Sequence, residues 1–325
     1  MSQRFDLAEK DVLVTGGMGF IGSHIVDSCL QSGAKVRIID DFSNGYKENL
    51  EHHQNNKKLE IVKGDIRSPK TLENVISDIK IIFHQAAKVN VTYSLVNPRL
   101  VNDVNTNGSI NVLNTARKFD VPKIVVASSS SVYGDTPILP KVETMQLQPI
   151  SPYGATKLAA ESMALAFSKS YGMDITALRY FNVYGPRQRG GPYAGVISIF
   201  IDSALEGTKL PIESDGHQSR DFTYVGDVVI ANLLGATTSN SSGKVYNIAY
   251  GQRTTILDLA NEIIQLTNSK SRIEFYPPRP GDIRHSLADI SAAKKDLNYE
   301  PQTSLRTGLQ KTIKWVLKKA CKKGS

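Results

Sequence analysis

The sequence predicts an α/β fold in which a doubly wound parallel sheet precedes a smaller mixed α/β lobe. Three observations lead to this prediction. Runs rich in β-branched residues alternate with longer helical patterns through the first half of the 325-residue chain, as in βαβ units. These runs are almost continuously apolar, as expected for strands covered on both faces. A glycine-rich turn joins the first run to the first helical pattern.

The first half of the chain supplies six predicted strands and four predicted helices. Each strand is a short apolar run bounded by polar residues or glycine. In the fourth helix, Ser151 can cap the first turn and Pro152 fits within it. The strands are predicted at 11–16, 35–40, 59–65, 80–86, 123–129 and 173–185, and the helices at 20–32, 70–78, 98–118 and 153–171.

The alternation ends at a loop rich in glycine and proline, residues 186–195. Long loops in compact domains are often functional. We expect a first domain at 1–181 and a second lobe at 182–325, with part of 220–250 packing back on the first domain. Further elements are predicted as a helix near 196–206, an ordered segment at 222–236, a strand at 245–249 and a helix at 256–267.

Composition indicates an ordinary globular chain. Hydrophobic residues make up 40% and charged residues 22%, and no apolar run approaches the roughly 18 residues needed to cross a bilayer. The first residues carry acidic side chains and no apolar run, so a secretory signal is not expected. Cys29 and Cys321 lack metal or redox spacing. We therefore expect free thiols, a cytoplasmic location, no metal site and no membrane partner.

The net charge of +8 raises the question of a nucleic-acid partner. The lysines crowd at the end of the chain, where cations suit the C-terminal dipole of a solvated helix. No nucleic-acid-reading motif accompanies them, so no such partner is expected. A positive field would also attract an acidic small ligand. The crowded lysines are Lys314, Lys318, Lys319, Lys322 and Lys323.

The glycine-rich turn predicts a Rossmann-type dinucleotide site. Gly16, Gly19 and Gly22 lie between the first strand and the first helix, where glycines permit a tight turn and close approach of a pyrophosphate. Asp40 ends the second strand, where a carboxylate can accept hydrogen bonds from a ribose diol. Because a carboxylate repels a 2′-phosphate, NAD is favoured over NADP.

Two further strand ends are candidates for the cofactor site. Asp65 and Ile66 end the third strand and could flank the adenine. Gln85, Ala86 and Ala87 end the fourth strand at the expected switch-point crevice. Both groups could instead serve only to pack the strand ends.

A hydroxyl-rich strand end and a helix start are predicted to meet at the same edge of the sheet. Residues 128–131 are four serines, while Tyr153 and Lys157 lie one helical turn apart. Ionising a free tyrosine at pH 7 costs about 4 kcal/mol. A lysine cation about 6 Å away supplies roughly 2–3 kcal/mol, and the positive nicotinamide of NAD⁺ can supply the rest. The cluster predicts a phenolate base with a serine hydroxyl holding the substrate oxygen, although such Tyr–Lys pairs also occur on ordinary helix faces.

Seven motifs in order resemble the extended short-chain dehydrogenase/reductase superfamily, and within it the nucleotide-sugar epimerases and dehydratases. They are TGGMGFIG, FHQAA, ASSSSVYG, YGATK, RYFNVYGP, RDFTYVGD and RPGDIRHSLAD, spread from about residue 10 to residue 310. The resemblance implies an NAD-binding Rossmann domain that keeps its cofactor through the cycle and a lobe that binds a nucleoside-diphosphate sugar. It also implies a homodimer formed through the helices at 98–118 and 153–171.

The resemblance further implies a role for each matching residue. Tyr153 is the base, Lys157 tunes it and binds the nicotinamide ribose, and Ser129 bonds the sugar O4, a role that Ser130 or Ser131 could share. The implied NAD contacts are Gly16, Gly19, Phe20, Ile21, Gly22, Asp40, Asn44, Gly45, Asp65, Ile66, Gln85, Ala86, Ala87, Asn105, Tyr153, Lys157 and Val183. The implied substrate contacts are Asn90, Ser129, Ser130, Asn182, Gly195, Val196, Arg220, Arg279, Asp282 and Ser286.

The serine run favours one reaction within this group. Dehydratases of the group carry an Asp-Glu pair in the segment that matches 129–132, and decarboxylases usually carry a Glu, whereas this chain has serines and Val132 before Tyr133. Without that acid, the site is expected to oxidise C4 of a UDP-sugar and return the hydride to the other face. This is a 4-epimerase, an isomerase that regenerates NAD at each turnover.

The sugar is predicted from two departures from related patterns. UDP-glucuronate 4-epimerases also carry a serine run, but their following loop usually begins Trp-Gly-Arg-Pro-Asp, whereas this chain reads RQRGGP at 187–192. Ser286 stands where hexose-restricted members carry Tyr, which leaves room for an N-acetyl group. We expect UDP-Glc/UDP-Gal and UDP-GlcNAc/UDP-GalNAc as substrates. A glucuronate 4-epimerase or decarboxylase, a 4,6-dehydratase, a non-catalytic sugar-nucleotide or NAD sensor, and a basic nucleic-acid binder remain alternatives.

Overall fold

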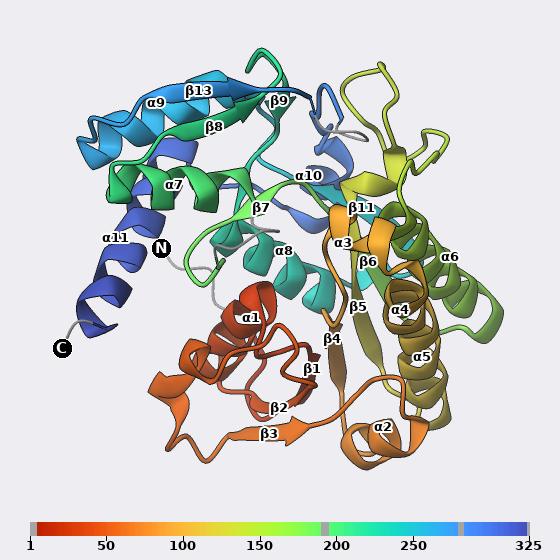
Figure 1. The fold of residues 1–325 in the computed structure, drawn as a ribbon. Helices are drawn as coiled ribbons and strands as arrows, with labels where there is room; N and C mark the ends of the chain where they lie inside the picture. The colour runs from red at the N-terminus through yellow and green to blue at the C-terminus, as the bar shows by residue number, and fades with distance from the viewer. Residues whose placement is uncertain (1–4, 190–194, 279–282, 324–325) are drawn as a thin grey trace.

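A seven-stranded parallel sheet forms the centre of the computed structural model, which describes residues 5–189, 195–278 and 283–323 (Figure 1). The strand order is β11-β6-β5-β4-β1-β2-β3, the doubly wound arrangement that the alternating pattern predicts. The strands are β1 (Asp11–Thr15), β2 (Lys35–Asp40), β3 (Leu59–Lys63), β4 (Ile81–His84), β5 (Lys123–Ser129), β6 (Ile175–Tyr180) and β11 (Lys244–Ile248).

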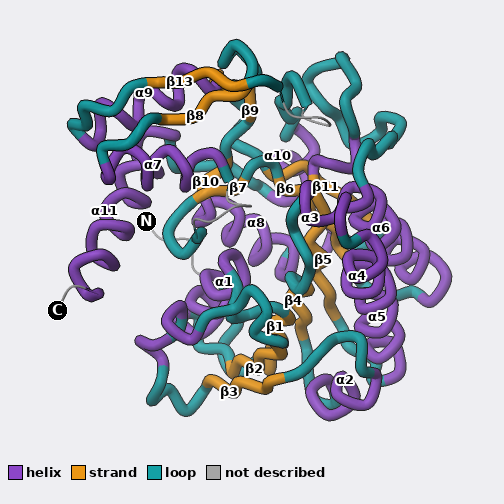
Figure 2. Tube along the Cα trace, in the orientation of Figure 1, coloured by secondary structure: helices purple, strands orange, loops and turns teal. Residues whose placement is uncertain are grey.

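Helices cover both faces of this sheet (Figure 2). Successive strand residues point to opposite faces, so Val12 and Val14 pack in one core cluster and Leu13 in the other. The edge strand β3 departs from the expected burial, because Ile61 is 45% exposed where no strand lies beyond it. One face carries α1 (Phe20–Gln31), α8 (Val225–Thr237) and α10 (Ser291–Leu297), and the other carries α2 (Pro69–Ile76), α5 (Gly108–Lys118) and α6 (Pro152–Tyr171).

The predicted helix at 98–118 is interrupted. It consists of α4 (Pro98–Asn102), a π-helical turn η3 (Asp103–Asn107) and α5. Within the π turn, the Asn105 amide bonds the backbone of Lys88 at both its N–H (2.8 Å) and its carbonyl (3.0 Å), and donates to Thr156 Oγ1 at 3.0 Å. Helical periodicity alone did not predict this turn, because π turns are set by such tertiary contacts and are common at functional sites.

Helix α6 begins where the sequence predicts. Ser151 is its N-cap and its hydroxyl accepts a hydrogen bond from the Gly154 N–H at 3.1 Å. Gly172 ends the helix in the left-handed conformation, with φ +68°. A further short helix, α3 (Val91–Val96), was not predicted; Asn90 caps it by accepting from the Tyr93 N–H at 2.6 Å.

The remaining elements form a second lobe beside the carboxyl ends of the strands (Figure 1). Its core lies between α7 and α9, and α11 packs against α9. No helix among the described residues is long and apolar enough to cross a membrane. The elements are β7 (Val183–Tyr184), α7 (Val196–Glu206), β8 (Leu210–Glu213), β9 (Ser219–Arg220), β10 (Thr223–Tyr224), β12 (Thr254–Thr255), α9 (Ile256–Thr267), β13 (Ile273–Tyr276) and α11 (Leu305–Lys323).

Candidate active site

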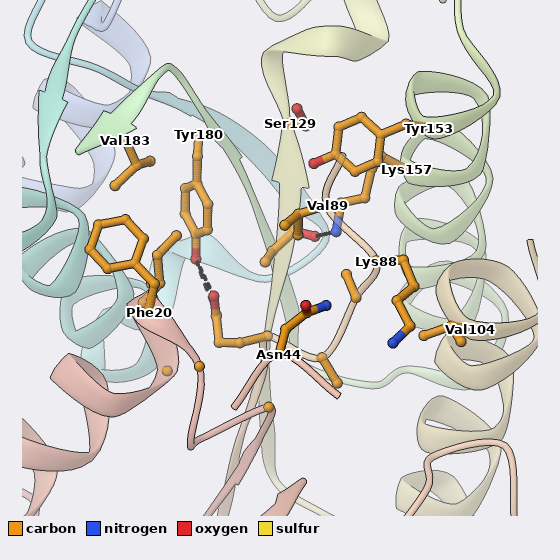
Figure 3. Close-up of a pocket in the computed structure, with 18 of the residues that line it drawn as sticks. Phe20, Asn44, Lys88, Val89, Val104, Ser129, Tyr153, Lys157, Tyr180 and Val183 are labelled. Carbon is orange, nitrogen blue, oxygen red and sulfur yellow. Dashed lines mark hydrogen bonds between the residues drawn. The ribbon is translucent and has the colours of Figure 1, made fainter. Parts of the chain in front are cut away.

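A cavity of about 520 Å³ lies at the carboxyl ends of β1, β2, β4, β5 and β6. This is where ligands bind in doubly wound sheets. In Figure 3, Phe20, Tyr180 and Val183 line one side and Tyr153 and Lys157 the other. The predicted site residues that line this cavity are Gly16, Gly19, Phe20, Ile21, Gly22, Asp40, Asn44, Gly45, Asp65, Ile66, Gln85, Ala86, Ala87, Ser129, Ser130, Tyr153, Lys157, Asn182, Val183, Arg220 and Ser286.

The glycine turn has the geometry that a dinucleotide pyrophosphate requires. Gly16 has φ +68°, and a β-carbon there would lie 2.8 Å from the Ala86 backbone. A β-carbon on Gly22 would lie 2.2 Å from the Gly16 carbonyl oxygen. Gly19 is the N-cap of α1 and supplies no side-chain cap. The close backbone approach and the helix N-terminus together suit a phosphate group.

Asp40 is fixed by the backbone around it. One carboxylate oxygen accepts from the Met18 N–H at 3.0 Å and the other from the Phe42 N–H at 2.8 Å. Burial raises the pKa of this carboxyl, and the two backbone hydrogen bonds oppose the rise. A β-carbon on Gly45 would lie 2.6 Å from Asp40 Oδ1, so only glycine leaves that approach open. The anchored carboxylate and the glycine turn fit NAD.

Asp65, which follows β3, forms an ion pair with Arg67. The Asp65 carboxylate accepts hydrogen bonds from Arg67 Nε at 2.9 Å and from Arg67 Nη2 at 2.6 Å. These bonds hold the pKa of the Asp65 carboxyl below its usual value. Asp65 and Ile66 nevertheless line the cavity. The ion pair therefore orients the Asp65 side chain at the cavity wall.

Tyr153, Ser129 and Lys157 meet at the end of β5. The Ser129 hydroxyl is hydrogen-bonded to the Tyr153 side chain, and the Lys157 ammonium donates to the Ala127 carbonyl. Burial raises the pKa of Tyr153, which the bond to Ser129 partly offsets. Burial also lowers the pKa of Lys157 to about 8, with Glu161 opposing the change. The phenol is thus protonated at neutral pH until another positive charge approaches it.

The four serines of the run point to different partners. The Ser128 hydroxyl donates to the buried Glu161 carboxylate at 2.6 Å. The Ser131 hydroxyl donates to Ser129 Oγ at 2.8 Å, and the Ser131 N–H lies 3.2 Å from the same oxygen. Ser129 is therefore the hydroxyl that contacts Tyr153, and Ser131 orients it. Ser130 lines the cavity beside them.

A buried polar group on the opposite wall was missed from the sequence. The Tyr180 hydroxyl lies 2.9 Å from Asn232 Oδ1 and 3.2 Å from Gln85 Oε1. Figure 3 shows the Tyr180 side chain on this wall. Tyr180 is 8% exposed and lines the cavity. A phenol at the carboxyl end of a central strand was the signal that could have found it. The other unpredicted lining residues include Asp41, Ser43, Lys88, Val89, Gln188 and Ile283.

A second cavity of about 270 Å³ adjoins the first in the C-terminal lobe. The two share Asn182, Val183, Gln188 and Arg220, and the predicted residues Gly195 and Val196 line the second. Asp221, which follows Arg220 in the sequence, is fully buried. Its carboxylate accepts hydrogen bonds from the N–H groups of Tyr250, Gly251 and Ala288. Burial raises the Asp221 pKa to about 6. This anchored carboxyl fixes the backbone that carries Arg220.

Two of the predicted site residues that the structure describes, Asn90 and Asn105, line neither cavity. Asn90 caps α3, and Asn105 lies behind the wall, where it holds the backbone of the lining residue Lys88. A direct contact of either with a ligand stays a prediction. Arg279 and Asp282 lie outside the described residues, as does part of the RQRGGP segment.

Comparison with known proteins gives one family. Residues 12–249 match the NAD dependent epimerase/dehydratase family. The UDP-glucose 4-epimerase of Mycolicibacterium smegmatis is 37% identical over 95% of this chain and 99% of its own. The solved UDP-N-acetylglucosamine 4-epimerase of Methanobrevibacter ruminantium, in complex with UDP-N-acetylmuramic acid, is 40% identical with a TM-score of 0.92, over 96% of this chain and 99% of its own.

A third similar protein bears on both cofactor and substrate. The UDP-glucuronic acid 4-epimerase of Bacillus cereus, solved with UDP-glucuronic acid and NAD, is 30% identical with a TM-score of 0.88, over 95% of this chain and 99% of its own. The cofactor of this chain is NAD, for which the glycine turn and the fixed Asp40 are built.

Proposed function

The chain belongs to the NAD-dependent epimerase/dehydratase family, and within it we propose a UDP-sugar 4-epimerase that accepts both UDP-hexoses and UDP-N-acetylhexosamines. One observation carries the proposal. The lining carboxylates of the larger cavity in the described chain are Asp40, Asp41 and Asp65, which follow β2 and β3 at the cofactor end. Around Ser129 and Tyr153, the described lining of this cavity therefore offers hydroxyls and a phenol, with no carboxylic acid beside them to drive elimination of water.

In the proposed reaction, Tyr153 removes the proton from the sugar O4 while the Ser129 hydroxyl holds that oxygen. Bound NAD takes the C4 hydrogen as a hydride and gives it back. Lys157 supplies a fixed positive charge one helical turn from the phenol, which favours the phenolate. Turnover of the 4-keto sugar before the hydride returns inverts C4, and Tyr153 then gives its proton back to O4.

Room at the sugar end supports the wider substrate range. Ser286 lines the larger cavity and is 7% exposed, held by its N–H to the Ser219 carbonyl at 3.0 Å. A tyrosine at this position would fill part of the space that an N-acetyl group needs. The position of Ser286 in the cavity wall therefore supports the expectation that the enzyme accepts N-acetylhexosamines.

In the described part of the RQRGGP segment, both arginines form ion pairs with carboxylates of the protein. Arg187 pairs with Asp27 at 2.6 Å and Arg189 with Glu48 at 3.0 Å, so both arginines are engaged on the NAD-binding half. A glucuronate carboxylate would need such a cation to replace its water. This supports neutral sugars over a uronate.

A cytoplasmic homodimer is part of the proposal. Apolar side chains are exposed on α3 and α6, including Leu95 at 54%, Val96 at 71% and Met163. Such patches commonly mark protein interfaces, and α6 is one of the helices through which the family resemblance implies dimers. Cys29 is buried as a free thiol, which suits a reducing compartment.

The proposal is tested with a panel of UDP-sugars incubated with the purified enzyme and no added NAD. We expect UDP-Glc and UDP-Gal to interconvert, as well as UDP-GlcNAc and UDP-GalNAc, with the products resolved by chromatography. Ser286→Tyr should lose the N-acetylhexosamine reaction and keep the hexose reaction. Conversion of UDP-glucuronate alone would overturn the proposal, and unchanged N-acetylhexosamine turnover in Ser286→Tyr would overturn its substrate range.

A further inference from the structure

The loop that follows β7 is attached to helix α1 of the NAD-binding half at two consecutive residues. His24 Nε2 donates to the Pro186 carbonyl oxygen at 2.9 Å. Arg187 Nη2 donates to Asp27 Oδ2 at 2.6 Å, and both side chains of this ion pair are about six-sevenths buried, 14% and 16% exposed. Figure 1 shows this green loop descending toward α1. Segments 160 residues apart in sequence are thus joined by a partly desolvated ion pair.

Arg189 attaches the same loop to a different segment. Its guanidinium carbon lies 3.4 Å from the centroid of the Tyr46 ring, and its Nη2 lies 3.0 Å from Glu48. Tyr46 follows Asn44 and Gly45, which line the NAD cavity. The loop after β7 therefore contacts the chain that forms one wall of that cavity.

Asp27 joins three parts of the molecule through one carboxylate. His52 Nε2 and His53 Nε2 lie 2.9 and 3.0 Å from its Oδ1, while Arg187 occupies its Oδ2. These three acid and imidazole groups are close enough to share a metal ion. The guanidinium on the second oxygen favours direct hydrogen bonds, because a cation there would face the charge of Arg187.

The backbone of Arg187 is held in an unusual conformation. Its φ is +71°, in the left-handed region that non-glycine residues rarely adopt. A residue keeps such a strained conformation only when the contacts around it hold it there, and residues of this kind are often found at functional sites. The next side chain, Gln188, lines both cavities and donates to the Val183 carbonyl at 3.0 Å. The contacts of Arg187 thus set the position of a residue that faces both ligand cavities.

We propose that Asp27, Arg187, Tyr46 and Arg189 form a clasp that retains NAD between turnovers. Residues of α1, residues of the segment after β2, and Gln188 of the loop after β7 all line the cavity. The clasp joins the loop after β7 to the other two segments, so in this proposal the part of the cavity that the three segments form opens for the dinucleotide only when these contacts break. The inference rests on the proposed function, in which one NAD takes and returns each hydride and so must remain bound.

The test uses Asp27→Asn, Arg187→Gly and the double variant. Asn keeps the shape of the side chain, and Gly accepts a positive φ without strain. Each protein is purified, NAD bound per chain is measured after exhaustive gel filtration, and the rate of NAD loss is followed. We expect both single variants to lose NAD about tenfold faster than the wild type, and the double variant to be no faster than either, because the two groups act as one pair.

Glu262→Gln is the matched control, because it breaks an ion pair with Arg306 on α9 and α11, away from the cavity. It should retain NAD like the wild type. Equal NAD retention in all variants would overturn the clasp, and so would additive losses in the double variant. NAD loss caused by EDTA would also overturn it, because NAD retention would then depend on a metal ion at Asp27. Saturating NAD should restore the cofactor content of the clasp variants, which shows that they remain folded.

The clasp and the proposed function fail in different ways. Wild-type protein that holds NAD but converts no UDP-sugar would contradict the 4-epimerase and leave the clasp intact. Protein that converts UDP-sugars, with Asp27→Asn and Arg187→Gly holding NAD as firmly as the wild type, would contradict only the clasp.

Discussion

Burial acts in opposite directions on the two ionisable groups of the reaction centre. It raises the pKa of Tyr153 and lowers that of Lys157 to about 8. Both changes favour the uncharged forms, so the protein without cofactor holds a neutral phenol. The positive nicotinamide of NAD⁺ is the charge that can reverse this for Tyr153, which couples base strength to cofactor oxidation state.

Tyr153→Phe removes the proton acceptor and leaves the ring packing in place. We expect kcat for UDP-sugar conversion to fall by about a hundredfold or more, the usual contribution of a positioned acid or base. NAD content should stay at the wild-type level, since the other cavity contacts remain. A variant that converts UDP-sugars at the wild-type rate would contradict the assigned base.

The pH profile should show a basic limb from Lys157. Its folded-state pKa of about 8 lies below the ordinary value of 10.5, so the ammonium loses its proton early as pH rises. The electrostatic support for the phenolate is present below that pKa and is lost above it, so kcat should decline above about pH 8. Between about pH 8 and 10.5 the unfolded chain binds more protons at this group, so its contribution to the free energy of unfolding rises with pH. A rate that stays level to pH 10 would contradict this assignment.

At the scale of elements, a buried ion pair holds the catalytic helix against the sheet. Glu161 of α6 accepts from Arg179 Nε of β6 at 2.9 Å and Nη2 at 2.6 Å, and from the Ser128 hydroxyl of β5. Arg179 also donates to the Tyr133 hydroxyl at 2.8 Å. The Glu161 carboxylate therefore ties α6, the helix that carries Lys157, to β6 and to β5, the strand that carries Ser129.

Glu161→Gln should destabilise the protein by about 3–5 kcal/mol, because it leaves a buried guanidinium without its counter-charge. The double variant Glu161→Met/Arg179→Met removes both charges and should recover much of that free energy of unfolding, measured by denaturant titration. Asp215→Asn, which breaks an exposed pair with Arg284, is the control and should change little. A Glu161→Gln protein as stable as the wild type would show that the pair does not hold the two elements together.

Structural features that depend on residues close together in the sequence could be predicted, whereas features set by contacts between distant residues could not. The strands, the glycine turn and the Ser151 cap were predicted because each depends on neighbouring residues. The π turn around Asn105 and the short helix α3 were missed, because tertiary contacts at Lys88 and a single cap at Asn90 determine them. The partners of Tyr180, which are Gln85 and Asn232, were missed for the same reason.

At the scale of the whole molecule, the site forms where two lobes meet. Helix α8 and strand β11 return to the sheet, with β11 parallel to β6, while α7 and α9 build the second lobe above its carboxyl edge. Distant pairs such as Asp27 and Arg187 connect the two sides, and no sequence pattern predicts contacts across 160 residues. The boundary at residue 181 and the dimer stay predictions.

In the proposed reaction, the C4 hydrogen moves to one retained NAD and returns to the opposite face of the same carbon. The most direct measurement uses UDP-glucose carrying deuterium at C4, with purified enzyme and no added cofactor, and locates the label by NMR. We predict UDP-galactose with the deuterium still at C4. Deuterium at C6 of a 4-keto-6-deoxy product, or its loss to solvent, would contradict it.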